Sequence, residues 1–290
     1  MILRETIKNK IESVIADKII SQKPVSGGCI NNAEIITTQS GKTYFLKTNS
    51  NSPRDMFLKE ANGLNEIAKA NVIHVPRVIY AADDFLILEN IVPKTKNKMF
   101  WENFGRDFGK LHKFTSKCFG FYEDNYIGST QQLNIPTKIE ATNWIEFYFS
   151  KRLLYQYKLA ETKGYADNEL QKAFSLMESR INIILNDCDA KPSLLHGDLW
   201  SGNFITDDSG NACLIDPAVY YGHREADLAM TRLFGGFDPR FYSAYIEENP
   251  LNDGYIYREN LYKLYHVLNH LNLFGSGYYN QAVDLINFYI

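Results

Sequence analysis

The stretch "LLHGDLWSGNF", residues 194–204, joins two apolar flanks by a turn-forming centre that carries His196, Asp198 and Asn203. Polar residues in a loop are ordinary, and capping of a following turn would explain Asp198 or Asn203 taken singly. An apolar run broken by His-Gly-Asp, with an Asn five positions after the Asp, is less common. The meaning of this stretch therefore depends on the residues that follow it.

Two β-rich runs flank the turn-forming "DDSGN" after this stretch: "NFIT" (203–206) and "ACLI" (212–215). They predict an antiparallel hairpin in which Thr206 lies near Ala212. In that register Asn203 and Asp216 emerge side by side at the open end of the hairpin. Asp198 lies in the loop that leads into this end.

These three side chains predict a site for a hard divalent cation and a base. Mg²⁺ prefers oxygen ligands and takes few of them from protein, which suits Asn203 and Asp216. A carboxylate close by, that of Asp198, can accept the proton of an attacking hydroxyl. Because three such residues converge, this interpretation is favoured over simple loop capping.

The first ninety residues predict a small antiparallel sheet with one helix inserted. The β-rich runs Ile35–Thr38 and Thr43–Lys47 are joined by the turn "QSGK", and two further strands are expected near Arg77–Tyr80 and Phe85–Glu89. The inserted helix runs from Pro53 to about Lys69. A glycine-rich bend, "SGGCINN", precedes the first of these strands.

Glu60 lies on the apolar side of the inserted helix, three residues after Phe57 and four before Leu64. A buried carboxylate needs a partner. Lys47, at the end of the preceding strand, is the candidate partner. The alternative is that Lys47 is an ordinary surface lysine at a strand edge.

The order of these parts is a glycine-rich bend, a strand Lys, a helix Glu, then Asp, Asn and a second Asp. Protein-kinase-like phosphotransferases use the same order. The sequence therefore predicts an α+β, two-lobed protein-kinase-like fold. The N-lobe, residues 1–90, combines the small antiparallel sheet with the helix. The C-lobe, residues 91–290, is mostly helical.

The chain resembles the fructosamine kinase (ketosamine-3-kinase) family from about Lys10 to Tyr278. The segments that carry the resemblance are "GGCIN", "FLKTN", "MFLKEANGL", "LLHGDLWSGNF", "LIDPAVYYGHREADLAM", "LFGGF" and "LYHVLNHLNLFG". The resemblance implies ATP-dependent phosphorylation of the 3-hydroxyl of a ketosamine, an adduct of a sugar with an amine. It also implies that phosphorylation destabilises the adduct, so that the family acts in deglycation.

Carried onto this sequence, the resemblance implies a role for each matching residue. Asp198 is the catalytic base, and Asn203 and Asp216 hold Mg²⁺. Three groups of residues are expected at ATP. Gly27, Gly28 and Cys29 cover its phosphates, Lys47 contacts the phosphates and pairs with Glu60, and the backbone of Glu89, Asn90 and Ile91 binds adenine.

The acceptor side is less defined. Trp200, two residues after the base, and His223, in "YGH", are the expected substrate contacts, and packing of Trp200 against helices is the alternative. Asp227, in "READLAM", is expected to hold the backbone of the catalytic loop. The family link of Cys29 to redox control suggests a redox-linked homodimer, with a monomer as the alternative.

Composition limits the partners. The 290 residues carry a net charge of -3, so nothing favours nucleic acid as a ligand. The N-terminus has no uninterrupted apolar region of a signal peptide and no run approaches the roughly 20 apolar residues of a membrane span. A cytoplasmic protein without a membrane partner is expected, acting on a small-molecule or protein-bound ketoamine.

Two alternatives remain at this point. One is another small-molecule kinase of the same fold, acting on an aminoglycoside, choline or homoserine. The segment "IEATNWIEFYFSKRLLYQYKLA", residues 139–160, argues against an aminoglycoside because it is not strongly acidic. The other is a pseudokinase that serves as a binding module, which the joint presence of Lys47, Glu60, Asp198, Asn203 and Asp216 disfavours.

Overall fold

The computed structural model describes residues 5–25, 32–49, 53–186 and 188–290. Contacts divide the chain into two compact units. The first comprises Met1–Phe100 with Phe204–Asp216, and the second Trp101–Asn203 with Pro217–Ile290. Among the described residues, no helix combines the length and hydrophobicity that a membrane span requires.

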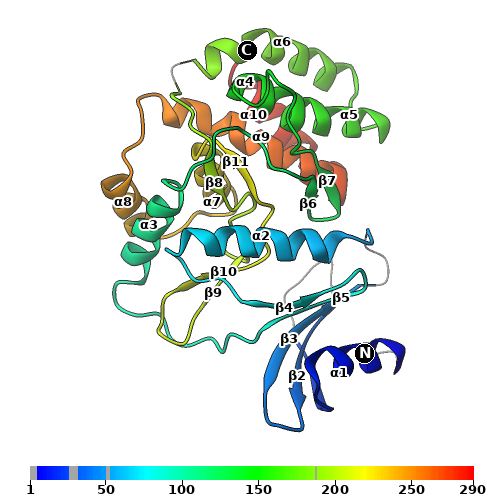
Figure 1. Cartoon of the computed structure of the whole chain (residues 1–290). Helices are drawn as coiled ribbons and strands as arrows, with labels where there is room; N and C mark the ends of the chain where they lie inside the picture. The colour runs from blue at the N-terminus through cyan, green and yellow to red at the C-terminus, as the bar shows by residue number, and fades with distance from the viewer. Residues whose placement is uncertain (1–4, 26–31, 50–52, 187) are drawn as a thin grey trace. The chain divides into compact units, whose positions relative to one another are not determined.

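The described part of the first unit contains a five-stranded antiparallel sheet in the order β1-β2-β3-β5-β4, with helices α1 and α2 (Figure 1). The element bounds are α1 Glu5–Ile15, β1 Ile19–Pro24, β2 Asn32–Thr38, β3 Thr43–Thr48, α2 Met56–Ala70, β4 Val78–Ala81 and β5 Phe85–Glu89. The predicted strands correspond to β2, β3, β4 and β5. Gly41, at φ 84°, permits the turn between β2 and β3.

The two helices cover opposite faces of this sheet. Successive side chains of a strand point to opposite faces. Leu46 of β3 lies in an apolar cluster with Ile11 of α1, whereas Lys47, the next residue, contacts Glu60 of α2. α1 therefore packs on one face and α2 on the other (Figure 1).

The hairpin that the sequence predicted after residue 203 consists of β9 (Phe204–Thr206) and β10 (Ala212–Leu214). Thr206 pairs with Ala212, which confirms the predicted register. The hairpin belongs to the first unit, in part because the Leu214 N–H donates to the carbonyl of His74 at 2.9 Å. The predicted lobes 1–90 and 91–290 did not foresee this placement, and their boundary stays a prediction.

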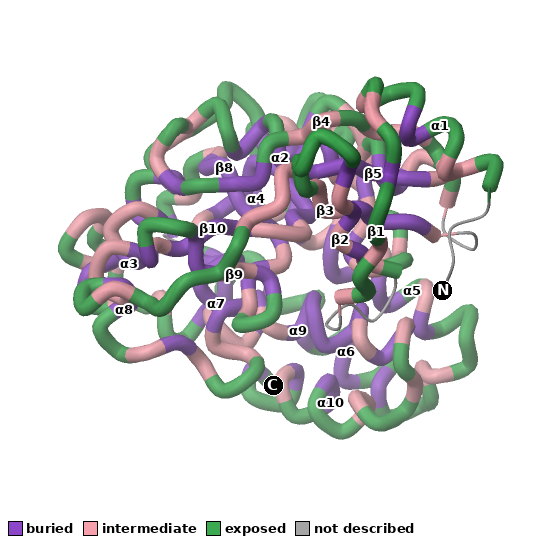
Figure 2. Tube along the Cα trace, turned by 90° about the horizontal axis from the view of Figure 1, so that it is seen from below, coloured by how far each residue is buried: buried purple, intermediate pink, exposed green. Residues whose placement is uncertain are grey.

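The second unit is mainly helical. Its element bounds are α3 Phe100–Leu111, β6 Asn125–Ile127, β7 Thr130–Gln132, α4 Trp144–Tyr148, a π-helical turn Phe149–Leu154, α5 Tyr155–Thr162, α6 Asn168–Ile184, β8 Ser193–Leu195, β11 Tyr220–Gly222, α7 Glu225–Leu233, α8 Pro239–Glu248, α9 Tyr255–Phe274, a 3-10 turn Ser276–Tyr278 and α10 Tyr279–Asn287. More than half of α9 is buried, so it forms the core of this unit (Figure 2). The predicted α+β class is confirmed.

Candidate active site

Lys47 of β3 lies between two carboxylates of the first unit. Its Nζ donates to Glu60 Oε1 of α2 at 2.7 Å and makes a close ion pair with Asp216, two residues after β10. The Lys47 side chain is only 7% exposed, whereas that of Asp216 is 42% exposed. The structure therefore brings the predicted Lys47–Glu60 pair together and adds Asp216 to it.

The charges of this cluster depend on one another. Burial by itself would lower the pKa of Lys47, but the charges of Asp216 and Glu60 outweigh it and hold that pKa above its usual value. Burial raises the pKa of Glu60, and the Lys47 charge opposes this rise. Lys47 is therefore a permanently charged ammonium.

The backbone at Asp216 is unusual. Its φ of 56° lies in the left-handed region, which residues other than glycine seldom adopt. Such conformations persist where the surroundings impose them, and they gather at functional sites. Here the ion pair with Lys47 helps to fix the carboxylate.

The loop that carries Asp198 is anchored by a carboxylate of α7, within the second unit. The buried Asp227 of α7 accepts the backbone N–H of His196 at 2.7 Å and that of Gly197 at 2.8 Å. Gly197 has φ 83°, and a Cβ there would lie 2.0 Å from the carbonyl oxygen of Ala218. The predicted structural role of Asp227 is thus confirmed.

Asn203 closes this loop onto Asp198. Its Nδ2 donates to the Asp198 carbonyl at 2.7 Å and to Asp198 Oδ2 at 3.1 Å. Because the amide nitrogen faces Asp198, the amide oxygen faces elsewhere. The amide oxygen of Asn203 and the half-exposed carboxylate of Asp216 are each oxygen donors, the type of ligand that Mg²⁺ prefers.

Several residues behind the loop were not predicted. His112, at the end of α3, contacts Asp227 through Nε2 at 3.2 Å and Tyr245 through Nδ1 at 2.7 Å. Gln132 of β7 donates to the Ala218 carbonyl at 2.9 Å, and the Ala218 N–H donates to His196. Their sequence neighbourhoods contain no pattern that could have revealed these long-range contacts.

The structure describes only some of the residues that are expected to bind the nucleotide. Gly27, Gly28 and Cys29 fall outside the described residues. Glu89 ends β5, opposite Tyr44, and the next two residues, Asn90 and Ile91, follow the strand. The Asn90 side chain donates to Thr43 Oγ1 at 3.1 Å.

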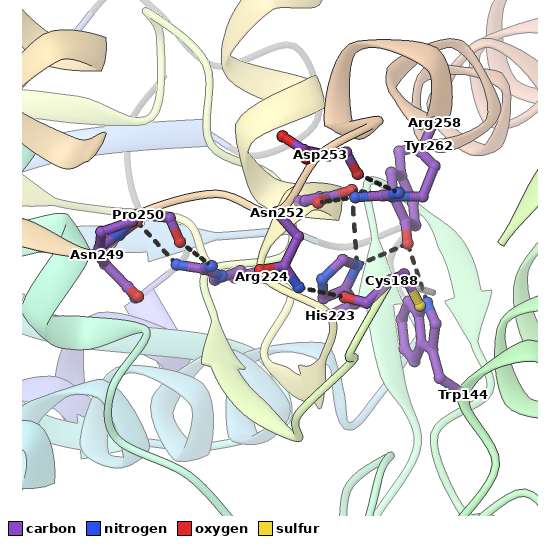
Figure 3. A network of polar contacts seen from close by, with 11 residues as sticks. Trp144, Cys188, His223, Arg224, Asn249, Pro250, Asn252, Asp253, Arg258 and Tyr262 are labelled. Atoms are coloured by element: carbon purple, nitrogen blue, oxygen red, sulfur yellow. Dashed lines mark hydrogen bonds and ion pairs between the residues drawn. The ribbon is translucent and has the colours of Figure 1, made fainter. Parts of the chain in front are cut away.

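Trp200 and His223, the expected substrate contacts, lie in contrasting environments. Trp200 is half-buried, and its ring meets that of Phe234 edge-on with centroids 5.7 Å apart. His223 is 3% exposed, and its Nδ1 lies 2.8 Å from the Tyr262 hydroxyl, which also accepts from Trp144 (Figure 3).

The surroundings of His223 favour a structural role. Burial, with the charges of Arg258 and Arg224, holds the pKa of His223 well below its usual value. Arg258 forms a buried ion pair with Glu225 through two hydrogen bonds of 2.7 Å. The substrate contact of His223 stays a prediction, and the structure encloses its ring among these side chains with 3% of the residue exposed.

Comparisons with known proteins agree with this arrangement. A sequence model of the family "Fructosamine kinase" matches residues 3–290. The chain is 40% identical to a chloroplastic protein-ribulosamine 3-kinase of Arabidopsis thaliana over 99% of this chain and 87% of the relative. It is 38% identical to the "Probable ketoamine kinase" of a Synechocystis strain, over 97% of this chain and 95% of the relative.

Solved structures extend the similarity to the fold. A proposed fructosamine-3-kinase from Thermobifida fusca superimposes with a TM-score of 0.86 at 27% identity, covering 98% of each chain. An aminoglycoside phosphotransferase with bound ADP superimposes with a TM-score of 0.67 at 13% identity, covering 99% of this chain and 100% of the other. The second likeness concerns the kinase-like fold alone.

Proposed function

Because the chain belongs to the fructosamine kinase family, we propose that it transfers the γ-phosphoryl group of ATP to the 3-hydroxyl of a ketosamine, in a reaction that leads to deglycation. The observation that carries this function is the family match over residues 3–290. Names of the relatives favour a ketosamine over an aminoglycoside, choline or homoserine as the acceptor.

The nucleotide is assigned to the first unit. Lys47 binds the ATP phosphates as a fixed charge, and Glu60 keeps its ammonium in place through the 2.7 Å contact. Gly27, Gly28 and Cys29 cover the phosphates, and the backbone of Glu89–Ile91 binds adenine. These last two assignments rest on the resemblance of the sequence.

The acceptor hydroxyl is assigned to Asp198. Its carboxylate accepts the hydroxyl proton as the hydroxyl oxygen bonds to the γ-phosphorus and the bond from that phosphorus to ADP breaks. Asn203 orients the carboxylate through the 3.1 Å contact. Trp200, in the same loop, offers a ring face to the sugar. Phosphoryl transfer needs positioning and charge stabilisation more than covalent catalysis, which these groups supply.

Mg²⁺ is assigned to the amide oxygen of Asn203 and the carboxylate of Asp216. When bound, the ion neutralises negative charge on the β- and γ-phosphates. The Asp216 carboxylate also holds the Lys47 ammonium, so the cation ligand and the phosphate ligand are positioned by one ion pair.

Finer properties of the protein stay predictions. The acceptor is proposed to be a small-molecule or protein-bound ketosamine, and the protein a monomer or a redox-linked homodimer through Cys29. That switch would make activity sensitive to peroxide and reversible by thiol, and Cys29→Ser would abolish the sensitivity. The expected cytoplasmic location also stays a prediction, since some relatives are named as chloroplastic.

The test is an ATP-consumption assay with Mg²⁺ on ribulose-lysine, fructose-lysine, kanamycin, choline and homoserine, with Asp198→Asn as the control. Turnover on a ketosamine that vanishes in the variant supports the proposal and ranks the sugars. Turnover only on another alcohol keeps the kinase chemistry and rejects the ketosamine. ATP binding without turnover on any acceptor favours the pseudokinase.

A further inference from the structure

Five rings of the second unit form an unbroken series that starts two residues after Asp198. We call this series the aromatic strip: Trp200, Phe234, His270, Phe274 and Tyr278. The ring centroids of Phe234 and His270 are 5.2 Å apart, and His270 lies 5.4 Å from Phe274 and 5.1 Å from Tyr278. With the 5.7 Å contact between Trp200 and Phe234, every ring touches the next.

Two rings of the strip are open to solvent. Phe234 is 38% exposed and Phe274 is 54% exposed. Single exposed apolar side chains need no explanation, but two exposed rings joined through a third make this part of the surface a candidate binding site. The sequence segments "LFGGF" and "LNHLNLFG", which contain these two rings, carry the family resemblance and have no role in the proposed chemistry.

The strip is built to keep its shape. A Cβ at Gly202 would lie 2.5 Å from two carbons of the Trp200 indole, so the absence of a side chain there lets the indole lie against its own loop. His270 and Phe274 sit on α9, the buried helix of this unit, and the His270 ring is tied to the His266 carbonyl at 2.6 Å. A rigid surface loses little conformational entropy when it binds a ligand.

The chemistry of the acceptor indicates what lies on this surface. In a ketosamine the nitrogen is four bonds from the oxygen of the 3-hydroxyl. When that oxygen meets Asp198, the amine and whatever carries it must leave the site close to the loop that bears Trp200. Burial lowers the pKa of His270, which leaves its ring neutral and unable to repel an ammonium. Aromatic faces attract methylene groups and ammonium cations alike.

We propose that Phe234, Phe274 and Tyr278 bind the carrier of the ketosamine, the alkylammonium chain and adjoining peptide that bear the sugar. These residues thereby determine how strongly the enzyme prefers ketosamines on long carriers over ketosamines on small amines. The inference rests on the proposed function and deepens it at the acceptor side.

The test compares two substrates with the same sugar, one on methylamine and one on the lysine of a short peptide. Replacement of one ring, in Phe274→Ala, is expected to lower kcat/KM for the peptide about tenfold through KM. The value for the methylamine adduct stays unchanged, and Phe274→Tyr, which keeps a ring, retains the preference. Phe234→Ala is expected to act in the same direction.

Phe288→Ala is the matched control, because Phe288 is 53% exposed in the same unit but contacts Tyr257 and Tyr289 instead of the strip. Equal losses on both substrates, no loss on either, or the same selective loss in Phe288→Ala would overturn the inference while the proposed function stands. A wild-type enzyme that phosphorylates neither ketosamine would overturn the proposed function as well.

Discussion

The ammonium of Lys47 is almost excluded from water and lies between the carboxylates of Glu60 and Asp216. A buried charge needs such partners, because taking it out of water costs several kcal/mol. Two carboxylates around one ammonium leave the cluster with an excess negative charge. A divalent cation at Asp216 would offset that excess. The charge of the cluster therefore favours the binding of a cation at the proposed metal site.

Glu60→Gln tests the first of these contacts. The amide keeps the shape of the side chain but removes the charge that holds Lys47, so we expect KM for ATP to rise about tenfold. Steady-state kinetics with varied ATP measures this. Glu66→Gln on the same helix is the control, because Glu66 pairs with the exposed Lys69. A KM that stays at the wild-type value in Glu60→Gln would contradict the role given to the pair.

Asp198→Asn tests the base. The substitution preserves volume and leaves the loop anchor at Asp227 untouched, so folding and nucleotide binding are expected to persist while kcat falls roughly 10²–10⁴-fold. Nucleotide affinity by calorimetry and kcat on ribulose-lysine separate the two effects. Asp208→Asn, in the exposed turn between β9 and β10, should behave as wild type. Retained turnover in Asp198→Asn would rule out its role as the base.

At the scale of elements, residues of α7 and of the segment that follows α3 anchor the catalytic loop, in addition to the contacts that the loop makes within itself. Asp227 accepts two backbone N–H groups of the loop, and His112 contacts the same carboxylate. Burial by itself would raise the pKa of Asp227, but its hydrogen bonds with His112 and with the Gly197 N–H help to lower it. The carboxylate is therefore ionised, as an acceptor of N–H groups must be.

Asp227→Asn is expected to destabilise the protein and slow the reaction together. An amide presents an NH₂ group where an acceptor is needed, which leaves a buried N–H unsatisfied at about 1–3 kcal/mol and lowers Tm by about 5 °C. Thermal unfolding followed by circular dichroism measures the change. Asp253→Asn, with an exposed side chain, is the control. A variant that melts with the wild type would show that the anchor contributes no stability.

At the scale of the whole molecule, buried histidines link stability to pH. Burial lowers the pKa of His112, His223 and His266, in the last case from 6.5 to about 3. The unfolded chain therefore binds more protons than the folded chain below about pH 6.5. The free energy of unfolding is then highest above that pH and falls as the pH drops.

The size of this effect can be measured at His266. Between its unfolded and folded pKa values it contributes about 1.4 kcal/mol per pH unit, or about 2 kcal/mol at pH 5. We expect Tm of the wild type to fall between pH 7.5 and 5.0. His266→Asn, which cannot take up a proton, should show a smaller fall over the same range, although it starts from a lower Tm. Parallel curves for the two proteins would contradict the linkage.

Local patterns determined much of the fold and of the candidate site. The turns at Gly41 and in "DDSGN" predicted two hairpins and the register of the second, because turn chemistry acts over a few residues. The buried position of Glu60 on its helix predicted the pair with Lys47, since periodicity places a side chain on one face. The edge strand β1, "IISQKP", was not predicted, because the apolar stripe of the first helix continues in spacing to Ile19, its one buried residue.

Contacts between distant parts of the chain were decided only by the tertiary structure. Lys47 meets Asp216 across 169 positions, and His112 meets Asp227 across 115. Long-range contacts also decide two other features: the assignment of the β9–β10 hairpin to the first unit and the enclosure of His223. Spacing along the chain carries the period of a helix, a strand or a turn, but packing brings these elements together, and it leaves no local signature in the sequence.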